Sequence, residues 1–128
     1  MQGASVDMVK GKKILIVEDD PDIRVMMGYL LRDEYDLVLC EDGRSGIDKA
    51  LEERPDLILL DIYMPGISGF EVCKIVRNTP EISSTPIIIL TAGALKEEVT
   101  NGYALGANDY IFKPFDPEDL IERIEKLL

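Results

Sequence analysis

The stretch LILLD at residues 57–61 decides the fold, because four consecutive aliphatic residues end in a carboxylate. A short, unbroken apolar run is typical of a strand that helices cover on both faces, as in a parallel sheet. A second such run, ILIV at residues 14–17, ends in Glu18, Asp19 and Asp20. The carboxyl ends of parallel strands open at one edge of a sheet, so we expect the acids of the two strands to meet there.

Carboxylates gathered at two strand ends predict a cation site. Negative charges in one place repel one another unless a cation lies among them. Carboxylate oxygens suit a hard divalent ion such as Mg²⁺, which keeps several waters and takes one or two protein carboxylates. The sequence therefore predicts Mg²⁺ as the cofactor, bound beside Asp61.

Composition bounds the class of protein. The chain has 128 residues, 46% of them hydrophobic, which is enough for one domain with a substantial core. Its formal net charge of -11 disfavours direct binding of nucleic acid, because phosphate backbones attract basic surfaces. Cys40 and Cys73 are predicted to be free thiols in a reducing compartment. No apolar run approaches the ~18 residues of a membrane span, and no signal peptide is recognised, so we expect a cytoplasmic protein.

Short apolar runs alternate with amphipathic helical patterns, as in repeated βα units. The predicted strands are residues 12–17, 36–40, 57–61, 87–91 and 109–113. Four helices lie between them and a fifth ends the chain; the first and last have clear apolar stripes, from Ile23 to Leu31 and from Leu120 to Leu128. The prediction is an α/β fold, a doubly wound (βα)5 arrangement with a five-stranded parallel sheet.

The fourth helix, about residues 95–105, is predicted to be weakly anchored. Its apolar stripe is narrow and consists of Leu95, Val99 and Tyr103, while polar residues occupy the rest of its surface. Two interpretations stay open, a marginal surface helix and a movable helix that binds a partner.

Two further strand ends supply groups that suit a phosphoryl group. Thr91 closes the fourth strand with a hydroxyl, and the small residues Ala92 and Gly93 let backbone N–H groups approach an anion. Lys113 closes the fifth strand with a compact positive charge. A cation, a carboxylate, a hydroxyl and an ammonium are the groups that transfer of a phosphoryl group to Asp61 requires.

Four segments resemble the receiver domain of two-component response regulators, the CheY-like family. They are residues 14–20 (ILIVEDD), 61–69 (DIYMPGISG), 90–92 (LTA) and 110–115 (YIFKPF). The resemblance covers residues 12–128 and leaves residues 1–11 as an N-terminal tail. It implies the flavodoxin-like and CheY-like strand order 2-1-3-4-5 and a cis bond before Pro114.

The resemblance also implies roles for single residues. Asp61 is the implied phosphoacceptor, with Thr91 and Lys113 as its catalytic partners. The implied metal ligands are Asp19, Asp61, the backbone carbonyl of Tyr63 and, through water, Glu18. The implied switch residues are Thr91 and Tyr110, and the implied backbone contacts to phosphate are at Ile62, Tyr63 and Ala92. Asp20 and Asp22 are expected to cap a helix or face solvent.

The chain contains no histidine, so it cannot serve as its own phosphohistidine donor. The family implies a histidine kinase or a histidine phosphotransfer protein as the donor, docking beside the first helix. The expected function is Mg²⁺-dependent phosphoryl transfer from this partner to Asp61 in a phosphorelay. Phosphorylation is expected to switch the surface of residues 95–128 toward a downstream effector or a homodimer. The chain would thus be a signalling phosphoacceptor that catalyses its own aspartyl phosphorylation and dephosphorylation, and not an enzyme with other substrates.

Three alternatives are disfavoured. An aspartate-nucleophile phosphatase of the haloacid dehalogenase type needs an Asp two residues after the nucleophile, where this chain has Tyr63. A flavodoxin-like flavin binder needs a hydroxyl-rich loop after the first strand, where residues 18–20 would repel phosphate. A receiver that acts only as a docking scaffold is expected to lack Asp61, Thr91 or Lys113, and all three are present.

Overall fold

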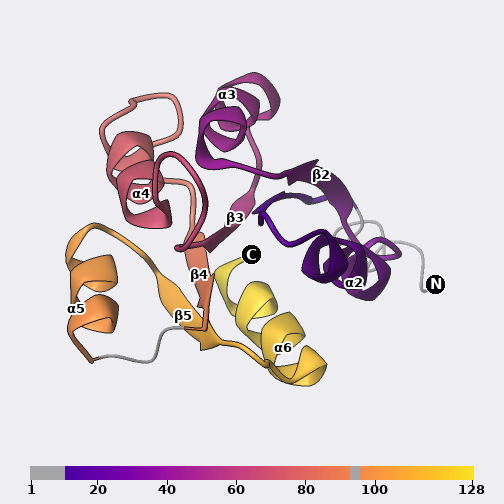
Figure 1. Cartoon of the computed structure of the whole chain (residues 1–128). Coiled ribbons are helices and arrows are strands. Elements are labelled where there is room, and N and C mark those ends of the chain that lie inside the picture. The colour runs from indigo at the N-terminus through magenta and orange to yellow at the C-terminus, as the bar shows by residue number, and fades with distance from the viewer. Residues whose placement is uncertain (1–10, 93–95) are drawn as a thin grey trace.

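The computed structural model describes residues 11–92 and 96–128, which form one parallel sheet between two layers of helices (Figure 1). Its strands are β1 (Lys13–Val17), β2 (Asp36–Cys40), β3 (Leu57–Asp61), β4 (Ile87–Thr91) and β5 (Asp109–Phe112). The helices are α2 (Pro21–Leu31), α3 (Gly43–Glu53), α4 (Gly69–Arg77), α5 (Lys96–Ala104) and α6 (Pro117–Leu127).

The strand order is β2-β1-β3-β4-β5, and every pairing is parallel. The predicted doubly wound fold and strand order are therefore confirmed. The predicted first and fifth strands are each one residue too long, at residues 12 and 113 respectively. Two residues named in the sequence analysis, Gly93 and Leu95, lie outside the described residues.

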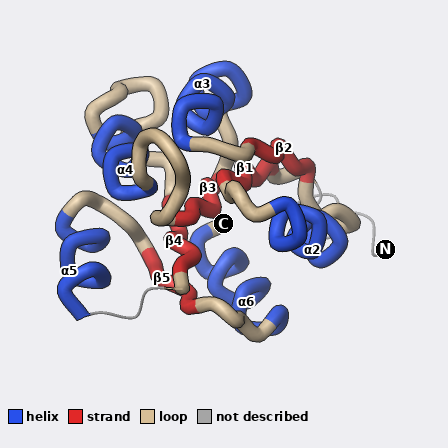
Figure 2. The backbone as a smooth tube through the Cα atoms, in the orientation of Figure 1, coloured by secondary structure: helices blue, strands red, loops and turns tan. Residues whose placement is uncertain are grey.

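Side chains alternate across the sheet and build a core on each face. Ile14 and Ile16 of β1 pack with α2 and α6, whereas Leu15 and Val17 pack with α3 and α4 on the opposite face. Figure 2 shows the strands as a band between these helices. Because both faces are covered, β3 and β4 are buried along their whole length, which explains their unbroken apolar sequences.

Helices start directly after the strand ends because their first turns are capped locally. The Asp20 side chain accepts a hydrogen bond from the backbone of Asp22, and Pro21 occupies the first turn of α2, where its missing N–H costs nothing. Asp116 caps α6 in the same way, through the backbone of Glu118. These caps keep the loops at the carboxyl edge of the sheet short, and the capping role expected of Asp20 is confirmed.

The start of α4 lies against the end of β3. The Gly69 N–H donates to the carbonyl of Ile62 at 2.9 Å, and a Cβ added at Gly69 would lie 2.3 Å from the carbonyl oxygen of Asp61. At the other end of α4, the Arg77 guanidinium donates to backbone carbonyls of Ser83, Thr85 and Gly106. Both ends of the helix are therefore held in place relative to the sheet.

Two further features concern the chain as a whole. The bond between Lys113 and Pro114 is cis, as the family resemblance implies. Among the described residues, 11–92 and 96–128, no helix is both long enough and apolar enough to cross a membrane.

Replacing Gly69 by Ala is expected to destabilise the fold by about 3 kcal/mol, because the new methyl group meets backbone atoms that cannot move aside. Gly28→Ala in α2 is the matched control, since a Cβ added at Gly28 has no atom within 4 Å. Because alanine favours the helix more than glycine does, this substitution should stabilise the protein by about 0.5–1 kcal/mol. Urea unfolding measures both changes. Similar effects of the two substitutions would contradict the close packing at Gly69.

Candidate functional site

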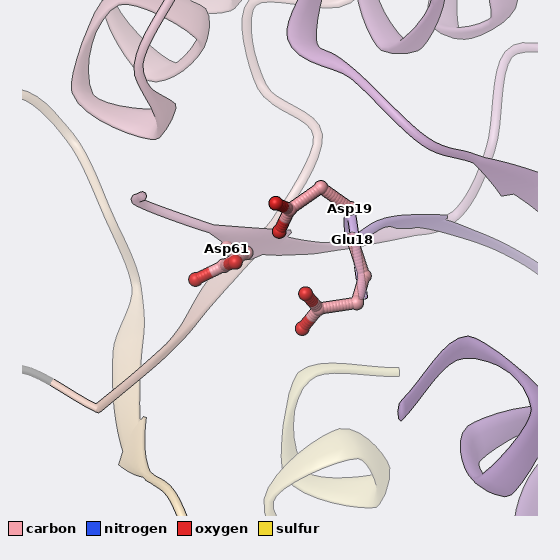
Figure 3. Close-up of side chains that lie close together, drawn as sticks. All are labelled: Glu18, Asp19 and Asp61. Atoms are coloured by element: carbon pink, nitrogen blue, oxygen red, sulfur yellow. The ribbon is translucent and has the colours of Figure 1, made fainter. Parts of the chain in front are cut away.

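Three carboxylates meet at the carboxyl edge of the sheet (Figure 3). Glu18 and Asp19 follow β1, and Asp61 ends the neighbouring strand β3, so the parallel pairing brings them together. One oxygen from each carboxylate lies within 4.8 Å of the others. Glu18 and Asp61 are buried and Asp19 is half-buried. The prediction that acids from two strands converge is confirmed.

Lys113 brings a positive charge against these acids. Its backbone N–H donates to the Thr91 carbonyl at 2.8 Å, which extends the pairing of β5 with β4 and aims the side chain at the site. The Lys113 Nζ lies 2.6 Å from Oε1 of Glu18 and 3.6 Å from Oδ2 of Asp61. The ammonium group thus makes its close ion pair with Glu18 and only a longer contact with Asp61.

Burial makes Asp61 an unusual carboxyl group. Burial first, and then the neighbouring negative charge of Glu18, raise the pKa of Asp61 to about 7, while Lys113 opposes this effect. A divalent cation among the three carboxylates would favour the ionised form, because opposite charge nearby lowers a carboxyl pKa. The site is therefore suited to bind a cation, and oxygen ligands of this kind fit Mg²⁺.

Arg24, which was not predicted as a site residue, binds the backbone of the acidic loop after β1. Its guanidinium Nη1 donates to the backbone carbonyls of Glu18 at 2.7 Å and Asp19 at 3.1 Å. The signal available in the sequence was a basic residue near the start of a helix, where positive charge opposes the helix dipole and needs a partner to be favourable. Arg24 orients both acids without contacting their carboxylates.

The other predicted site residues line the same edge. Thr91 ends β4 and is fully buried, and Ala92 after it is exposed. Ile62, after Asp61, is buried, whereas the Tyr63 side chain is 54% exposed. The backbone contacts to phosphate predicted for Ile62, Tyr63 and Ala92 stay predictions.

Tyr110 connects the sheet edge to α5. Its hydroxyl donates to the backbone carbonyl of Glu98 at 3.0 Å, and its ring occupies the space that a Cβ at Gly102 would fill. The ring centroid lies 5.7 Å from that of Tyr103 and 5.9 Å from that of Phe112. Burial first, and then the negative charge of Glu98, raise the pKa of the Tyr110 hydroxyl to about 12. Tyr110 therefore links β5 to α5 through a protonated hydroxyl.

An open depression of about 810 Å³ borders Asp19. The loops after β2 and β3 and the first turns of α3 form its walls, with Glu41, Asp48 and Pro65 among the lining residues. The acidic cluster therefore borders an open surface at Asp19.

Comparison with known proteins places this geometry in a family. A model of the response regulator receiver domain matches residues 14–125. The transcriptional regulatory protein ResD of Bacillus subtilis is 42% identical over 124 residues, which are 96% of this chain and 50% of ResD. The DNA-binding response regulator MtrA of Mycolicibacterium smegmatis is 39% identical over 118 residues, which are 91% of this chain and 50% of MtrA. The chain thus spans about half the length of these relatives.

Solved structures agree with the sequence relatives. The chemotaxis protein CheY4 of Vibrio cholerae superposes with a TM-score of 0.87 and 37% identity, covering 91% of this chain and 98% of that one. The receiver domain of a Pseudomonas aeruginosa sensor histidine kinase gives a TM-score of 0.85 and 33% identity, covering 91% and 97% of the two chains. That receiver domain has a magnesium ion coordinated in its active site cleft.

Asp61→Asn is expected to stabilise the metal-free protein increasingly as the pH rises. The folded state raises the pKa of Asp61 from 3.8 to about 7, so it binds more protons than the unfolded state between these values, and stability is lost as the pH rises through about 7. The stability advantage of Asp61→Asn over wild type should grow by about 2 kcal/mol between about pH 5.5 and about pH 8.5.

Urea unfolding in EDTA at several pH values measures this difference. Asp33→Asn, at an exposed position in the turn after α2, is the control and should show no such growth with pH. An advantage of Asp61→Asn that is constant over the range would contradict the raised pKa.

Proposed function

Because the chain belongs to the family of response regulator receiver domains, we propose that Asp61 accepts a phosphoryl group from a phosphohistidine on a histidine kinase or a histidine phosphotransfer protein. The observation that carries the proposal is the position of Asp61 between two further carboxylates and Lys113 at the open edge of the sheet. A buried carboxylate there is held in place to attack phosphorus, because its strand fixes its orientation.

Each of the surrounding groups is proposed to contact a different part of the phosphoryl group during transfer. The ammonium of Lys113, 3.6 Å from Oδ2 of Asp61, is the proposed partner of one phosphoryl oxygen. The hydroxyl of Thr91, at the end of β4, is the proposed donor to another. Backbone N–H groups at Ile62, Tyr63 and Ala92 are the proposed remaining contacts to the phosphoryl group. The chain thereby catalyses its own phosphorylation and, with water as the acceptor, its own dephosphorylation.

Mg²⁺ is the proposed cofactor. Asp19, Asp61 and the Tyr63 carbonyl are the proposed direct ligands, and Glu18 the proposed ligand through water. When bound, Mg²⁺ supplies positive charge that neutralises phosphoryl oxygens during transfer. The cluster of Glu18, Asp19 and Asp61 supports this choice, as does the magnesium ion in the related Pseudomonas aeruginosa receiver domain.

Thr91 and Tyr110 are the proposed switch. A phosphoryl group at Asp61 would draw the Thr91 hydroxyl toward it and shift the equilibrium of Tyr110 and α5 between two arrangements. The hydrogen bond from Tyr110 to Glu98 supports this route, because it couples β5 to α5 directly. The proposed output surface is residues 95–128.

The proposed partner at the output surface is an effector protein, an effector domain or a second copy of this chain. Two charged residues of this surface, Asp109 and Arg123, already pair with each other at 2.7 Å within the chain. MtrA is named as DNA-binding, yet it is about twice as long as this chain, so we assign DNA contact to regions beyond the receiver. We propose that residues 12–128 form the receiver, that residues 1–11 are a tail and that the protein acts in the cytoplasm.

Acetyl phosphate with Mg²⁺ should add one phosphoryl group to the wild-type protein, because the site itself supplies positioning and charge. Asp61→Asn should remove this addition, and the exposed control Asp33→Asn should keep it. Intact-protein mass spectrometry measures the mass increase. Equal incorporation in wild type and Asp61→Asn would exclude Asp61 as the phosphoacceptor.

Mg²⁺ should stabilise the folded protein, because it relieves repulsion among the three carboxylates. For a site of about millimolar affinity, a tenfold excess of Mg²⁺ contributes about 1.4 kcal/mol, or a rise in melting temperature of about 5 °C. Asp19→Ala should lose most of this rise. If this variant keeps the full rise, the ion binds elsewhere on the protein.

A further inference from the structure

Glu18 makes its shortest contact with Lys113. The distance from Lys113 Nζ to Oε1 of Glu18 is 2.6 Å, whereas Oδ2 of Asp61 is 3.6 Å away. The Glu18 side chain is 1% exposed and that of Lys113 is 16% exposed. A charged hydrogen bond so sheltered from water is stronger than an exposed ion pair, so the ammonium is held where Glu18 places it.

The second oxygen of Glu18 is also engaged. Its Oε2 accepts a hydrogen bond from the backbone N–H of Asp20 at 3.1 Å, at the start of α2. The carbonyl of Glu18 accepts another from Arg24 at 2.7 Å. Glu18 is therefore fixed at its backbone and at both carboxylate oxygens, and it forms a bridge from the β1–α2 loop to the end of β5.

We propose that Glu18 is a positioning residue for Lys113: its carboxylate holds the ammonium group away from Asp61 and thereby leaves the Asp61 oxygens open to a metal ion and to phosphorus. The proposal rests on the proposed function of Asp61 and concerns the unphosphorylated state. It gives Glu18 a role through Lys113 that is separate from any contact with the metal.

The length of the Glu18 side chain is the feature that makes this possible. An aspartate at this position would be shorter by one methylene, or about 1.5 Å along the chain, and its oxygens would no longer reach Lys113 at 2.6 Å. The lysine would then be free to close the 3.6 Å gap to Asp61 and form a direct ion pair there. A metal ion would have to displace that ammonium before it could bind Asp61.

Glu18→Asp keeps the charge of the site, but the shorter side chain no longer reaches Lys113. The substitution therefore separates the positioning of Lys113 from the effect of charge alone. We expect the Mg²⁺ dissociation constant, measured by NMR titration, to rise about tenfold, which is the size of effect seen when groups that orient metal ligands are lost. The 15N and 1H signals of the Lys113 ammonium group should shift in the metal-free variant. Glu41→Asp is the control for the same shortening of a nearby glutamate. Glu41 borders the depression beside Asp19 and pairs with Arg24 rather than with Lys113, so this substitution should leave both quantities unchanged.

The same substitution in a Lys113→Met background distinguishes positioning from metal ligation. If Glu18 acts through Lys113, then Glu18→Asp should change the Mg²⁺ affinity of the Lys113→Met protein by less than about twofold. A tenfold change that persists in this background would show that Glu18 acts as a metal ligand and would overturn the proposal. An unchanged affinity and an unchanged Lys113 signal in the Glu18→Asp protein would overturn it as well.

These measurements do not depend on phosphoryl transfer. If acetyl phosphate fails to modify Asp61 while the Lys113-dependent change in Mg²⁺ affinity appears, the proposed function fails and the role of Glu18 stands. Melting curves in EDTA verify that each variant is folded. If Glu18→Asp is unstable, Glu18→Gln replaces it and is compared with and without Lys113→Met. Loss of the Glu18 charge weakens Mg²⁺ binding in both backgrounds, so the positioning role predicts a larger rise in the dissociation constant where Lys113 is present, and equal rises would overturn it.

Discussion

The repulsion among three carboxylates at one edge of a buried sheet is the constraint on which the rest of the structure depends. One carboxylate oxygen from each of Glu18, Asp19 and Asp61 lies within 4.8 Å of the other two, and Lys113 offsets only part of their charge. An unpaired buried charge is costly, and Asp61 responds with a pKa raised to about 7. A bound cation would therefore lower the repulsion among these carboxylates. The sheet and the loops around the site prevent the carboxylates from moving apart.

Contacts made to backbone groups contribute to this rigidity. Gly69 lets the start of α4 pack directly on the backbone of Asp61, and Arg24 binds the carbonyls of the acidic loop. Parallel pairing of β1 with β3 sets the spacing between the two groups of acids. The carboxylates therefore stay close even though moving apart would lower their repulsion, and this closeness suits the folded state to bind a cation.

Rules of periodicity and parallel pairing were enough to predict five parallel strands and the convergence of Glu18, Asp19 and Asp61. The strand order was predicted from the family resemblance. The sequence did not predict that Lys113 pairs more closely with Glu18 than with Asp61. The two contacts differ by 1.0 Å, and side-chain conformations decide a difference of this size. Arg24 was not predicted as a site residue for a related reason: its partners are backbone carbonyl groups, which every residue has. Backbone partners leave almost no mark in a sequence.

The link between Tyr110 and α5 has the same property. The tyrosine hydroxyl binds the carbonyl of Glu98, and its ring fits against the bare backbone of Gly102. Neither of these two contacts needs a particular side chain on α5 beyond the glycine. Outward residues of the helix other than Tyr103, whose ring lies 5.7 Å from that of Tyr110, can therefore be exchanged while both contacts remain. A helix joined in this way can acquire a new binding specificity during evolution while the proposed phosphorylation site remains as it is.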